Sequence, residues 1–442
     1  MKTITNITYL AFALLAFAPF GLSPQARAVC QQGCLTNENT VLGDDALLNN
    51  TGFENTVVGF NALLNNTDGS FNMATGDRAL FSNTTGSFNT ATGYKALFSN
   101  TTGATNTANG VFALFFNTTG GANTASGFSA LSHNTTGIDN TATGAEALLF
   151  NTTGFNNTAH GRYALFLNTT GISNTASGFE ALFSNSTGNN NTATGSGALV
   201  SNRAGNSNTA SGVNALSVNT GGDNNTAIGI DALLNNTTGS FNIALGADAG
   251  ENLTTGSSNI DIANRGVAGE ANTIRIGTRE KHTNTFIAGI SGATVPTGVA
   301  VIVDANGHLG TTTSSARFKE AIKPMDKASE AILALRPVTF HYKKELDAKG
   351  TSQFGLLAED VAKVNADLVA HDGQGKPYTV RYEAVNAMLL NEFLKEHRTV
   401  QEQQKEIDAL KAELQEQRAL IQKVSAQLEV SKPATQTVLN NQ

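Results

Sequence analysis

The stretch NTATGYKALFSNTTGAT, residues 89–105, is one copy of a unit that recurs throughout residues 39–258. The unit reads N-T-A-x-G-x-x-A-L-x-x-N-T-T-G-x-x and is 17 residues long, except that the first copy lacks one Thr at Thr51-Gly52. A fixed period of this kind indicates one stacked architecture, in which each repeat contacts only its neighbours. The copies begin at Asn39, Asn55, Asn72, Asn89, Asn106, Asn123, Asn140, Asn157, Asn174, Asn191, Asn208, Asn225 and Asn242.

The residue types in the unit predict the structural role of each position. The recurring pair Ala96-Leu97 predicts an apolar spine, and Gly93 recurs where the chain must turn tightly or take a positive φ. Asn100 and its equivalents predict ladders of side-chain amides between coils. The period is too short for a pair of helices, so we expect a mainly β protein with a β-solenoid or β-roll over residues 29–258.

Composition excludes several functional classes. At 442 residues the chain should hold two or more domains. Lys and Arg total 28 against 35 Asp and Glu, and this net charge of −7 argues against nucleic acid as a partner. No zinc-ligand spacing is present and the repeat lacks the Gly-Gly-x-Gly-x-Asp pattern of calcium-binding rolls, so we expect neither a metal nor a cofactor.

The acidic side chains of the repeat are scattered. A glycan hydrolase needs two carboxyl groups paired in a groove, and no such pair recurs from coil to coil. The many N-x-T triplets follow the strict period, which indicates a structural role and not glycan attachment. The acidic residues in question are Asp77, Glu146, Glu180 and Asp231.

Residues 1–28 are typical of a secretory signal peptide. Lys2 precedes an apolar run, and Ala26-Arg27-Ala28 fits an A-x-A cleavage site. No other stretch reaches the ~18 apolar residues of a membrane span, so we expect an exported protein without a transmembrane segment. Cys30 and Cys34 are the only cysteines and could form a disulfide, either locally or between chains.

A β neck is expected over residues 259–313. Isoleucines alternate with polar residues at 260–262 and 274–276, which indicates strands. Asn306-Gly307 lies between the apolar runs Val301–Val303 and Leu309 and predicts a hairpin. We expect His308 to lie in this surface turn.

A small α+β domain is expected over residues 314–388. Pro337 should end a first short helix, and Gly373 and Gly375 mark a hairpin turn. The expected elements are a helix at Lys327–Leu335, a strand at Val338–Lys343, an apolar run at Phe354–Leu357, a helix at Glu359–Val364, a turn at Asp372–Gly375 and a strand at Tyr378–Tyr382.

A long helix should begin near Ala384 and form a coiled coil over residues 389–430. Polar Gln403 and Gln417 at position d are compatible with a trimer; the alternative is a charged helix that packs on its own domain. The tail, residues 431–442, is predicted to be disordered. Position a takes Phe393, Val400, Ile407, Leu414, Ile421 and Leu428, and position d takes Leu389, Glu396, Gln403, Leu410, Gln417 and Val424.

The segment SSARFK, residues 314–319, places a serine and a lysine five residues apart. A serine hydroxyl is a weak nucleophile until a base takes its proton, and a neutral lysine amine can be that base. An unperturbed lysine has a pKa of about 10.4, so such an amine must be desolvated to act near neutral pH. The spacing alone is unspecific.

The order of motifs around this pair is more specific. S-S-x-R-x-K is followed by L-R-P-V-T-F-H-Y-K, F-G-L-L-A-E-D-V, V-x-Y-E-A-V-N-A-M-L-L and the heptads. This order, over about residues 311–428, resembles the peptidase S74 family, the C-terminal intramolecular chaperone domain of phage tailspikes and tail fibres. The resemblance implies a domain that trimerises, guides the folding of the β fibre before it and then cuts itself off by serine–lysine chemistry.

The family motif assigns roles residue by residue. Ser314 would be the nucleophile, Lys319 the general base and Arg317 a residue that orients the loop, with the cut between Thr313 and Ser314. Ser315, four residues before Lys319, remains an alternative nucleophile, but the family spacing of five favours Ser314.

The repeats resemble, more loosely, the N-S-x-A-x-G head repeats of trimeric bacterial autotransporter adhesins. This implies a surface fibre that could bind a cell-surface or glycan ligand. We therefore expect an exported homotrimeric, adhesin-like fibre whose chaperone self-cleaves once, as a single-turnover serine endopeptidase. The alternatives are a tailspike-like glycan-processing protein and an uncleaved structural fibre with an inactive dyad.

Overall fold

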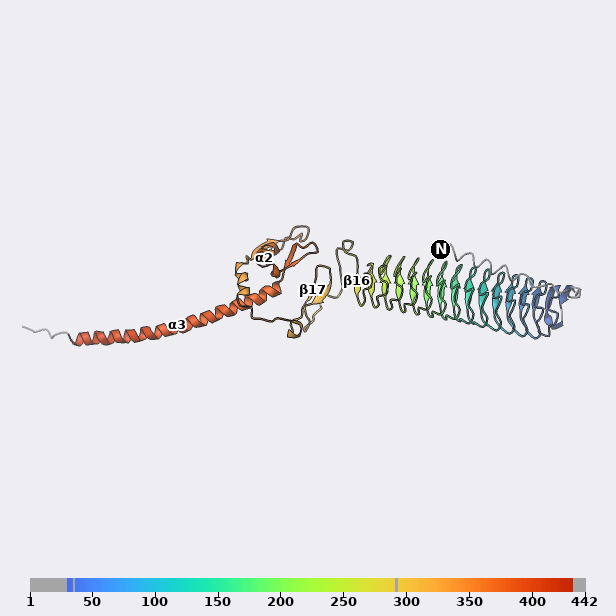
Figure 1. The fold of residues 1–442 in the computed structure, drawn as a ribbon, viewed down its shortest axis with the longest axis horizontal. Coiled ribbons are helices and arrows are strands. Elements are labelled where there is room, and N and C mark those ends of the chain that lie inside the picture. Colours follow the sequence, from blue (N-terminus) through green and yellow to red (C-terminus); the bar gives the residue numbers. More distant parts are fainter. Residues whose placement is uncertain (1–29, 35, 291–292, 432–442) are drawn as a thin grey trace, which may run out of the picture. The chain divides into compact units, whose positions relative to one another are not determined.

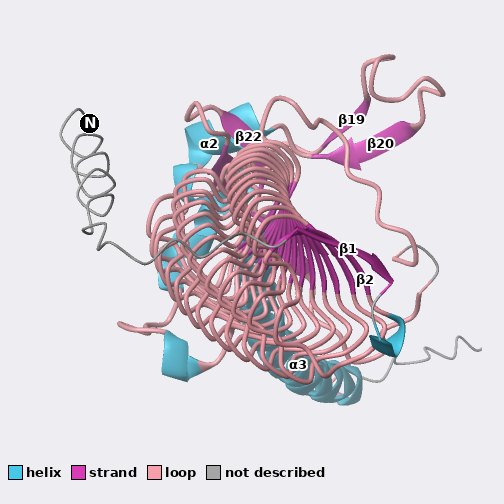
Figure 2. Ribbon diagram, turned by 90° about the vertical axis from the view of Figure 1, so that its right-hand side faces the viewer, coloured by secondary structure: helices cyan, strands magenta, loops and turns pink. Residues whose placement is uncertain are grey.

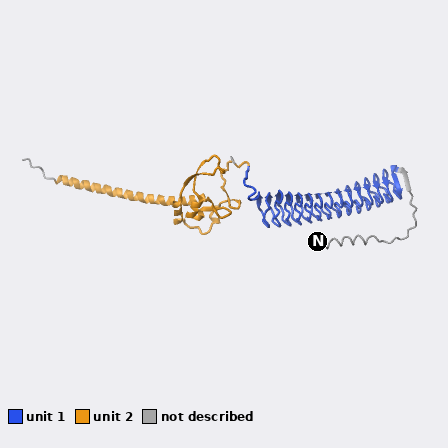
Figure 3. Cartoon of the chain, turned by 90° about the horizontal axis from the view of Figure 1, so that it is seen from above, with its two compact units in different colours: residues 1–287 blue, residues 288–442 orange. Residues whose placement is uncertain are grey.

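The structure is a computed structural model that describes residues 30–34, 36–290 and 293–431. The chain divides into two compact units, Met1–Ile287 and Ala288–Gln442 (Figure 3). The expected signal peptide, residues 1–28, lies outside the described residues, as does the expected tail from residue 432. The boundary between the units falls within the segment predicted to be the neck.

The first unit is a β-solenoid of about 14 turns with 17-residue repeats, as predicted. Its 16 strands form one sheet in chain order, parallel throughout except that β1 pairs antiparallel with β2 (Figure 1). The strands are β1 (Cys30–Cys34), β2 (Thr40–Asp44), β3 (Thr56–Val58), β4 (Met73–Thr75), β5 (Thr90–Thr92), β6 (Thr107–Asn109), β7 (Thr124–Ser126), β8 (Thr141–Thr143), β9 (Thr158–His160), β10 (Thr175–Ser177), β11 (Thr192–Thr194), β12 (Thr209–Ser211), β13 (Thr226–Ile228), β14 (Ile243–Leu245), β15 (Ile260–Ile262) and β16 (Ile274–Ile276). A short 3-10 helix, η1 (Thr36–Glu38), lies between β1 and β2.

Each coil from β2 to β14 buries three apolar side chains. The middle residue of the strand, such as Ala142, points inward, and Ala147 and Leu148 complete the buried interior of the same coil. The strands seen along the stack overlap on one side, while turns and loops form the rest of each coil (Figure 2). The backbone N–H of Leu148 donates to the carbonyl of Ala164 in the next coil at 2.9 Å, so the turns pair between coils much as the strands do. The predicted apolar spine is confirmed.

Two columns of buried asparagines run along the interior. The predicted ladder is confirmed: Nδ2 of Asn117 donates to Oδ1 of Asn100 at 2.8 Å and to the carbonyl of Gly120 at 2.9 Å. The first asparagine of each unit forms a second ladder, in which the backbone N–H of Asn106 donates to Oδ1 of Asn89 at 3.0 Å. Asn106 also donates to the carbonyl of Gly120 at 2.9 Å, so this glycine joins the two columns. Both columns satisfy polar groups that would otherwise be buried without partners.

Glycine is required at two positions of each coil, of which Gly93 and its equivalents also have a positive φ. Gly93 has a φ of 130°, and a Cβ atom added there would lie 2.6 Å from the carbonyl oxygen of Gly110 in the next coil. The same coil also holds Lys95, Leu97 and Thr105 at positive φ, between 52° and 59°. Residues other than glycine rarely adopt a positive φ. Here the hydrogen bonds between coils hold the backbone in this conformation.

The second unit begins with the predicted hairpin. β17 (Val301–Val303) pairs antiparallel with β18 (Leu309–Thr311). In the turn, Oδ1 of Asp304 accepts the backbone N–H groups of Asn306 at 2.8 Å and His308 at 2.9 Å. The side chain of His308 is exposed, as expected of a surface turn.

The α+β part that follows has a small core, made by Val361, Leu368, Val369, Val380 and Met388. The segment predicted as a helix at residues 327–335 is a 3-10 helix, and the strand predicted at residues 378–382 ends two residues earlier because the long helix begins at Tyr382. The elements are η2 (Ala316–Phe318), η3 (Asp326–Ala334), β19 (Val338–His341), β20 (Ser352–Gly355), α2 (Ala358–Val364), η4 (Ala366–Leu368), β21 (Val369–His371), β22 (Pro377–Val380) and α3 (Tyr382–Val430).

The long helix α3 exposes its apolar positions. The six residues at position a, Phe393 to Leu428, are 45% to 65% exposed in the single chain. Only its first turns pack on the unit's own core, through Met388 and contacts with η3. α3 and every other described helix fall short of the length and apolar character that a membrane crossing demands.

Candidate functional site

The predicted serine–lysine pair lies on an exposed loop between β18 and η3. Ser314 precedes the short helix η2 and Lys319 follows it, so the two residues lie at opposite ends of that helix. The backbone N–H groups of Phe318 and Lys319 donate to the carbonyls of Ser315 and Ala316 at 3.1 and 3.0 Å, which fixes this turn.

The side chains of this loop have few partners. Ser314, Arg317 and Lys319 are all exposed. Arg317 places its guanidinium 4.6 Å from the centre of the Phe318 ring, a cation–π contact with the adjacent residue. Within the described part of the chain, the side chains of Ser314 and Lys319 make no hydrogen bond or ion pair with another residue. One chain by itself therefore does not supply the dry surroundings that a lysine base needs.

A different serine and lysine, which sequence reasoning missed, lie in contact in this unit. Ser329 of η3 is fully buried and its Oγ lies 3.4 Å from Nζ of Lys395 on α3. Oγ of Ser329 also bonds Oε1 of Glu392 at 2.5 Å and accepts from Asn391 at 2.7 Å. Glu392, 2.7 Å from Lys395, raises the pKa of that lysine and keeps its amine protonated. This cluster therefore holds η3 on α3.

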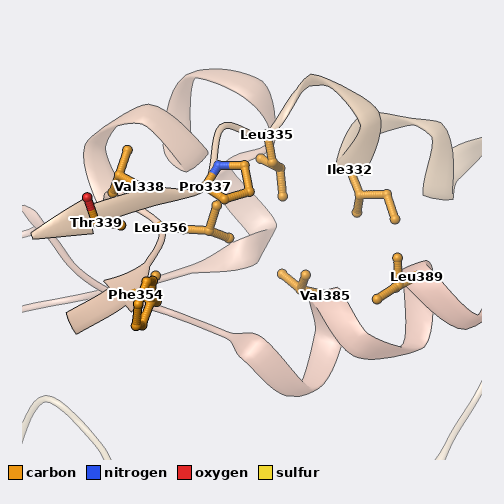
Figure 4. A pocket seen from close by; sticks show the side chains of 10 residues that line it. Ile332, Leu335, Pro337, Val338, Thr339, Phe354, Leu356, Val385 and Leu389 are labelled. Carbon is orange, nitrogen blue, oxygen red and sulfur yellow. The ribbon is translucent and has the colours of Figure 1, made fainter. Parts of the chain in front are cut away.

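An apolar groove crosses the same unit. It has a volume of about 500 Å³ and lies between η3, β19, β20 and the start of α3 (Figure 4). Figure 4 shows Ile332, Leu335, Val385 and Leu389 around an open space, and Phe354 at one side is 81% exposed. Large apolar side chains left open to solvent in this way mark a contact surface.

The other residues predicted to carry chemistry lie apart from this loop. Cys30 and Cys34 are the first and last residues of the extended strand β1. Among the acids of the repeat, Asp77 lies 3.5 Å from Arg78, and Asp231 accepts a hydrogen bond from Asn214 in the preceding coil at 3.1 Å. The described residues include no cluster of three or more His, Cys, Asp or Glu side chains suited to a metal ion.

The described chain thus consists of a β-solenoid and a second unit that holds a hairpin, a small α+β core and a long helix. Residues 314–370 match the peptidase S74 family, described as chaperone of endosialidase, which confirms the resemblance inferred from the motifs. The match begins at Ser314 and ends within β21. No curated protein and no solved structure shows significant similarity to the chain. A chaperone domain of this family attached to a β-solenoid is the organisation of a tail-fibre-like or tailspike-like protein.

Proposed function

We propose that this chain is an exported homotrimeric fibre whose C-terminal chaperone drives assembly and then cuts the chain once, between Thr313 and Ser314. The observation that carries the proposal is the family match, which begins at Ser314, the first residue after the proposed cut. The solenoid on the N-terminal side of the cut is the part that would remain as the mature fibre. Its outward side chains are where a cell-surface or glycan ligand would bind.

The apolar surfaces of the second unit support assembly. Full burial of one large aliphatic or aromatic side chain stabilises by roughly 1.5–3 kcal/mol. The six position-a residues of α3 are about half exposed, so their burial in a coiled coil would contribute on the order of 6 kcal/mol per chain. The exposed groove around Phe354 and Leu389 offers a second contact surface in the same unit.

The cleavage step uses the two side chains in sequence. Oγ of Ser314 attacks the carbonyl carbon of Thr313 while the neutral amine of Lys319 takes the hydroxyl proton. The proton passes to the nitrogen of Ser314 as its bond to Thr313 breaks, which leaves an ester that water then hydrolyses. The products are a chain ending in the carboxylate of Thr313 and a fragment beginning at Ser314, so each molecule cuts once, in its own chain or in a neighbouring one. Arg317 would orient the loop.

The exposure of the pair implies that cleavage follows assembly. Lys319 is exposed in the single chain, and neighbouring chains would supply the desolvation that one chain lacks. The two cysteines fit the same assembly. Along an extended strand, residues four apart have Cα atoms about 13 Å apart, beyond the span of a disulfide, so Cys30 and Cys34 are suited to bonds between chains.

The experiment is the intact mass of the purified full-length protein, alone and as three variants. We expect a fragment beginning at Ser314 from the original chain and from Ser315→Ala, and no fragment from Ser314→Ala or Lys319→Ala. Loss of the fragment in Ser315→Ala alone would move the nucleophile to Ser315. A single full-length species in every sample would refute self-cleavage and leave an uncleaved fibre with an inactive dyad; light scattering on the same samples tests the trimer separately.

A further inference from the structure

The outer face of the sheet changes character at its C-terminal end. Each three-residue strand of the solenoid sheet presents its first and third residues outward, so the sheet carries two outward columns. From β5 to β12 the first column is threonine throughout, and the third is mainly serine or threonine. In the last four strands the outward residues are Thr226 and Ile228, Ile243 and Leu245, Ile260 and Ile262, and Ile274 and Ile276.

These seven aliphatic residues form one contiguous surface, which we call the isoleucine face. The strands pair in register, so Ile228 lies beside Leu245, which lies beside Ile262. Five of the seven are between 43% and 70% exposed: Ile228, Ile243, Leu245, Ile274 and Ile276. Cross-strand neighbours lie about 4.8 Å apart, so no other side chain separates them.

The preceding coils show that folding does not require these isoleucines. Thr209 and Ser211 occupy the two outward columns of β12, with the same parallel pairing to β13 as in the rest of the sheet. In β13 and β14 the inward residue between the columns, Ala227 or Ala244, supplies the buried interior as in the earlier coils, whereas in β15 and β16 this position is Asp261 and Arg275. An outward isoleucine adds nothing to that interior and exposes apolar surface to water.

Charge and composition around the face favour a second copy of the chain as its occupant. Arg275 is bound to Glu270 by three hydrogen bonds of 2.7 to 2.9 Å, and Arg265 lies 2.8 Å from Asp248, so both of these arginines are paired. The face itself is uncharged and aliphatic, which is typical of contacts between identical subunits and not of transient partners. A flat surface of this kind can pack against its own copy around a symmetry axis.

The segment that follows β16 also exposes large apolar side chains. Phe286, Ile287 and the whole of β17 are at least half exposed within the single chain. The chaperone begins at residue 314, fewer than forty residues after β16. Chains joined through it would hold their isoleucine faces at high effective concentration.

We propose that the isoleucine face of β13–β16 is an interface between copies of this chain, buried when the fibre assembles. The proposal rests on the homotrimer proposed above and adds to it the surface by which the solenoids meet. The contact extends the apolar association from the chaperone into the last coils, so that the subunits remain joined there after the chaperone is cut away.

The test compares the reactivity of two introduced thiols in the assembled full-length protein. Ile243→Cys places a thiol on the isoleucine face, and Thr124→Cys places one in the same outward column of β7. With a maleimide reagent and peptide mass spectrometry, which separates these thiols from the native cysteines, we expect labelling at position 243 to be roughly tenfold or more slower than at position 124, because a buried position reacts only on opening.

A second variant measures the contribution of the face to assembly. Ile243→Thr, Leu245→Thr, Ile274→Thr and Ile276→Thr together restore the residue that earlier coils carry, and threonine suits a strand as well as isoleucine does. We expect the assembly of this variant to dissociate at a protein concentration roughly tenfold or more higher than the original chain, since exposed aliphatic contacts are lost. Met73→Thr with Val58→Thr, in the same columns of β4 and β3, is the matched control and should leave dissociation unchanged.

The outcomes separate this interface from the proposed trimer. A trimer that labels equally at positions 243 and 124 would overturn the interface and leave the trimer standing. The interface would also be overturned if the four-residue variant dissociated at the same protein concentration as the original chain. A chain that is monomeric in sedimentation would overturn the homotrimer, and the interface with it.

Discussion

Replacement of Asn134 by alanine should open the solenoid locally. This side chain is fully buried; its Nδ2 donates to Oδ1 of Asn117 at 2.8 Å and its Oδ1 accepts from Nδ2 of Asn151 at 2.7 Å. Nδ2 also donates at 2.9 Å to the carbonyl of Gly137, which keeps a second donor, Nδ2 of Asn123, at 2.8 Å. Asn134→Ala thus leaves Oδ1 of Asn117 without this donor and one Nδ2 hydrogen of Asn151 without its acceptor.

Each stranded buried group costs roughly 1–3 kcal/mol, so we expect the free energy of opening these coils to fall by about 4 kcal/mol. A fall of about 1.4 kcal/mol in the free energy of opening raises the opening equilibrium constant tenfold. Amide hydrogens around residue 134 should therefore exchange roughly a thousandfold faster. Hydrogen-exchange mass spectrometry on the full-length protein measures this peptide by peptide. Coils far from the substitution should change little, because each repeat contacts only its neighbours.

The matched control is Asn109→Ala, the same change at an outward position of β6. Its exchange should match that of the original protein within a few-fold, since a surface substitution of this kind usually changes stability by less than about 0.5 kcal/mol. If Asn134→Ala exchanged no faster than Asn109→Ala, the amide column would not stabilise the solenoid, and the reasoning would be wrong.

Two further predictions concern the solenoid. Burial raises the pKa of Asp261 to about 6, with Glu270 adding to the increase and Arg275 opposing it. Its two carboxylate oxygens have no hydrogen-bond partner among the described residues. The folded state therefore holds this proton more tightly than the unfolded state, so stability falls as the pH rises from about 4 through 6. We expect the last coils to be about 1 kcal/mol more stable at pH 5 than at pH 7.5, measured by hydrogen exchange; a pH difference that persists in Asp261→Ala, which introduces the residue found at this position from β4 to β14, would contradict this assignment. Gly127→Ala should destabilise the fold by several kcal/mol, roughly 3 or more, because its φ is 140° and the new Cβ would lie 2.5 Å from the carbonyl oxygen of Gly144. Gly221→Ala, with open space around it, should leave the melting temperature unchanged, and equal melting of both variants would refute the argument.

The repeat made much of the solenoid predictable. Once the period is known, the neighbour of each residue is the residue 17 positions away, so the stacking of Ala96-Leu97 and the ladder at Asn100 follow from the letters alone. The second ladder, through Asn89, was not predicted, although the same asparagine opens every copy. The positive φ of Leu97 was also not predicted from the sequence. Leucine has no preference for that conformation, and only the hydrogen bonds to the neighbouring coils impose it.

The chaperone region was predictable in its motifs but not in its contacts. The order of short motifs identified the family, which the match at residues 314–370 confirms. The contact of Ser329 with Lys395 joins residues 66 positions apart, and no local pattern relates them. The exposure of Ser314 and Lys319 likewise depends on what the rest of the unit covers.

By itself, the sequence determined which residues stack in the solenoid and which family the C-terminal segment matches, because both are encoded in local, repeated or ordered letters. Only the tertiary structure decided that the serine–lysine pair is open to water in one chain and that the isoleucines of the last strands form one exposed face. Both are matters of burial, which depends on the whole path of the chain and not on the residues nearest in sequence.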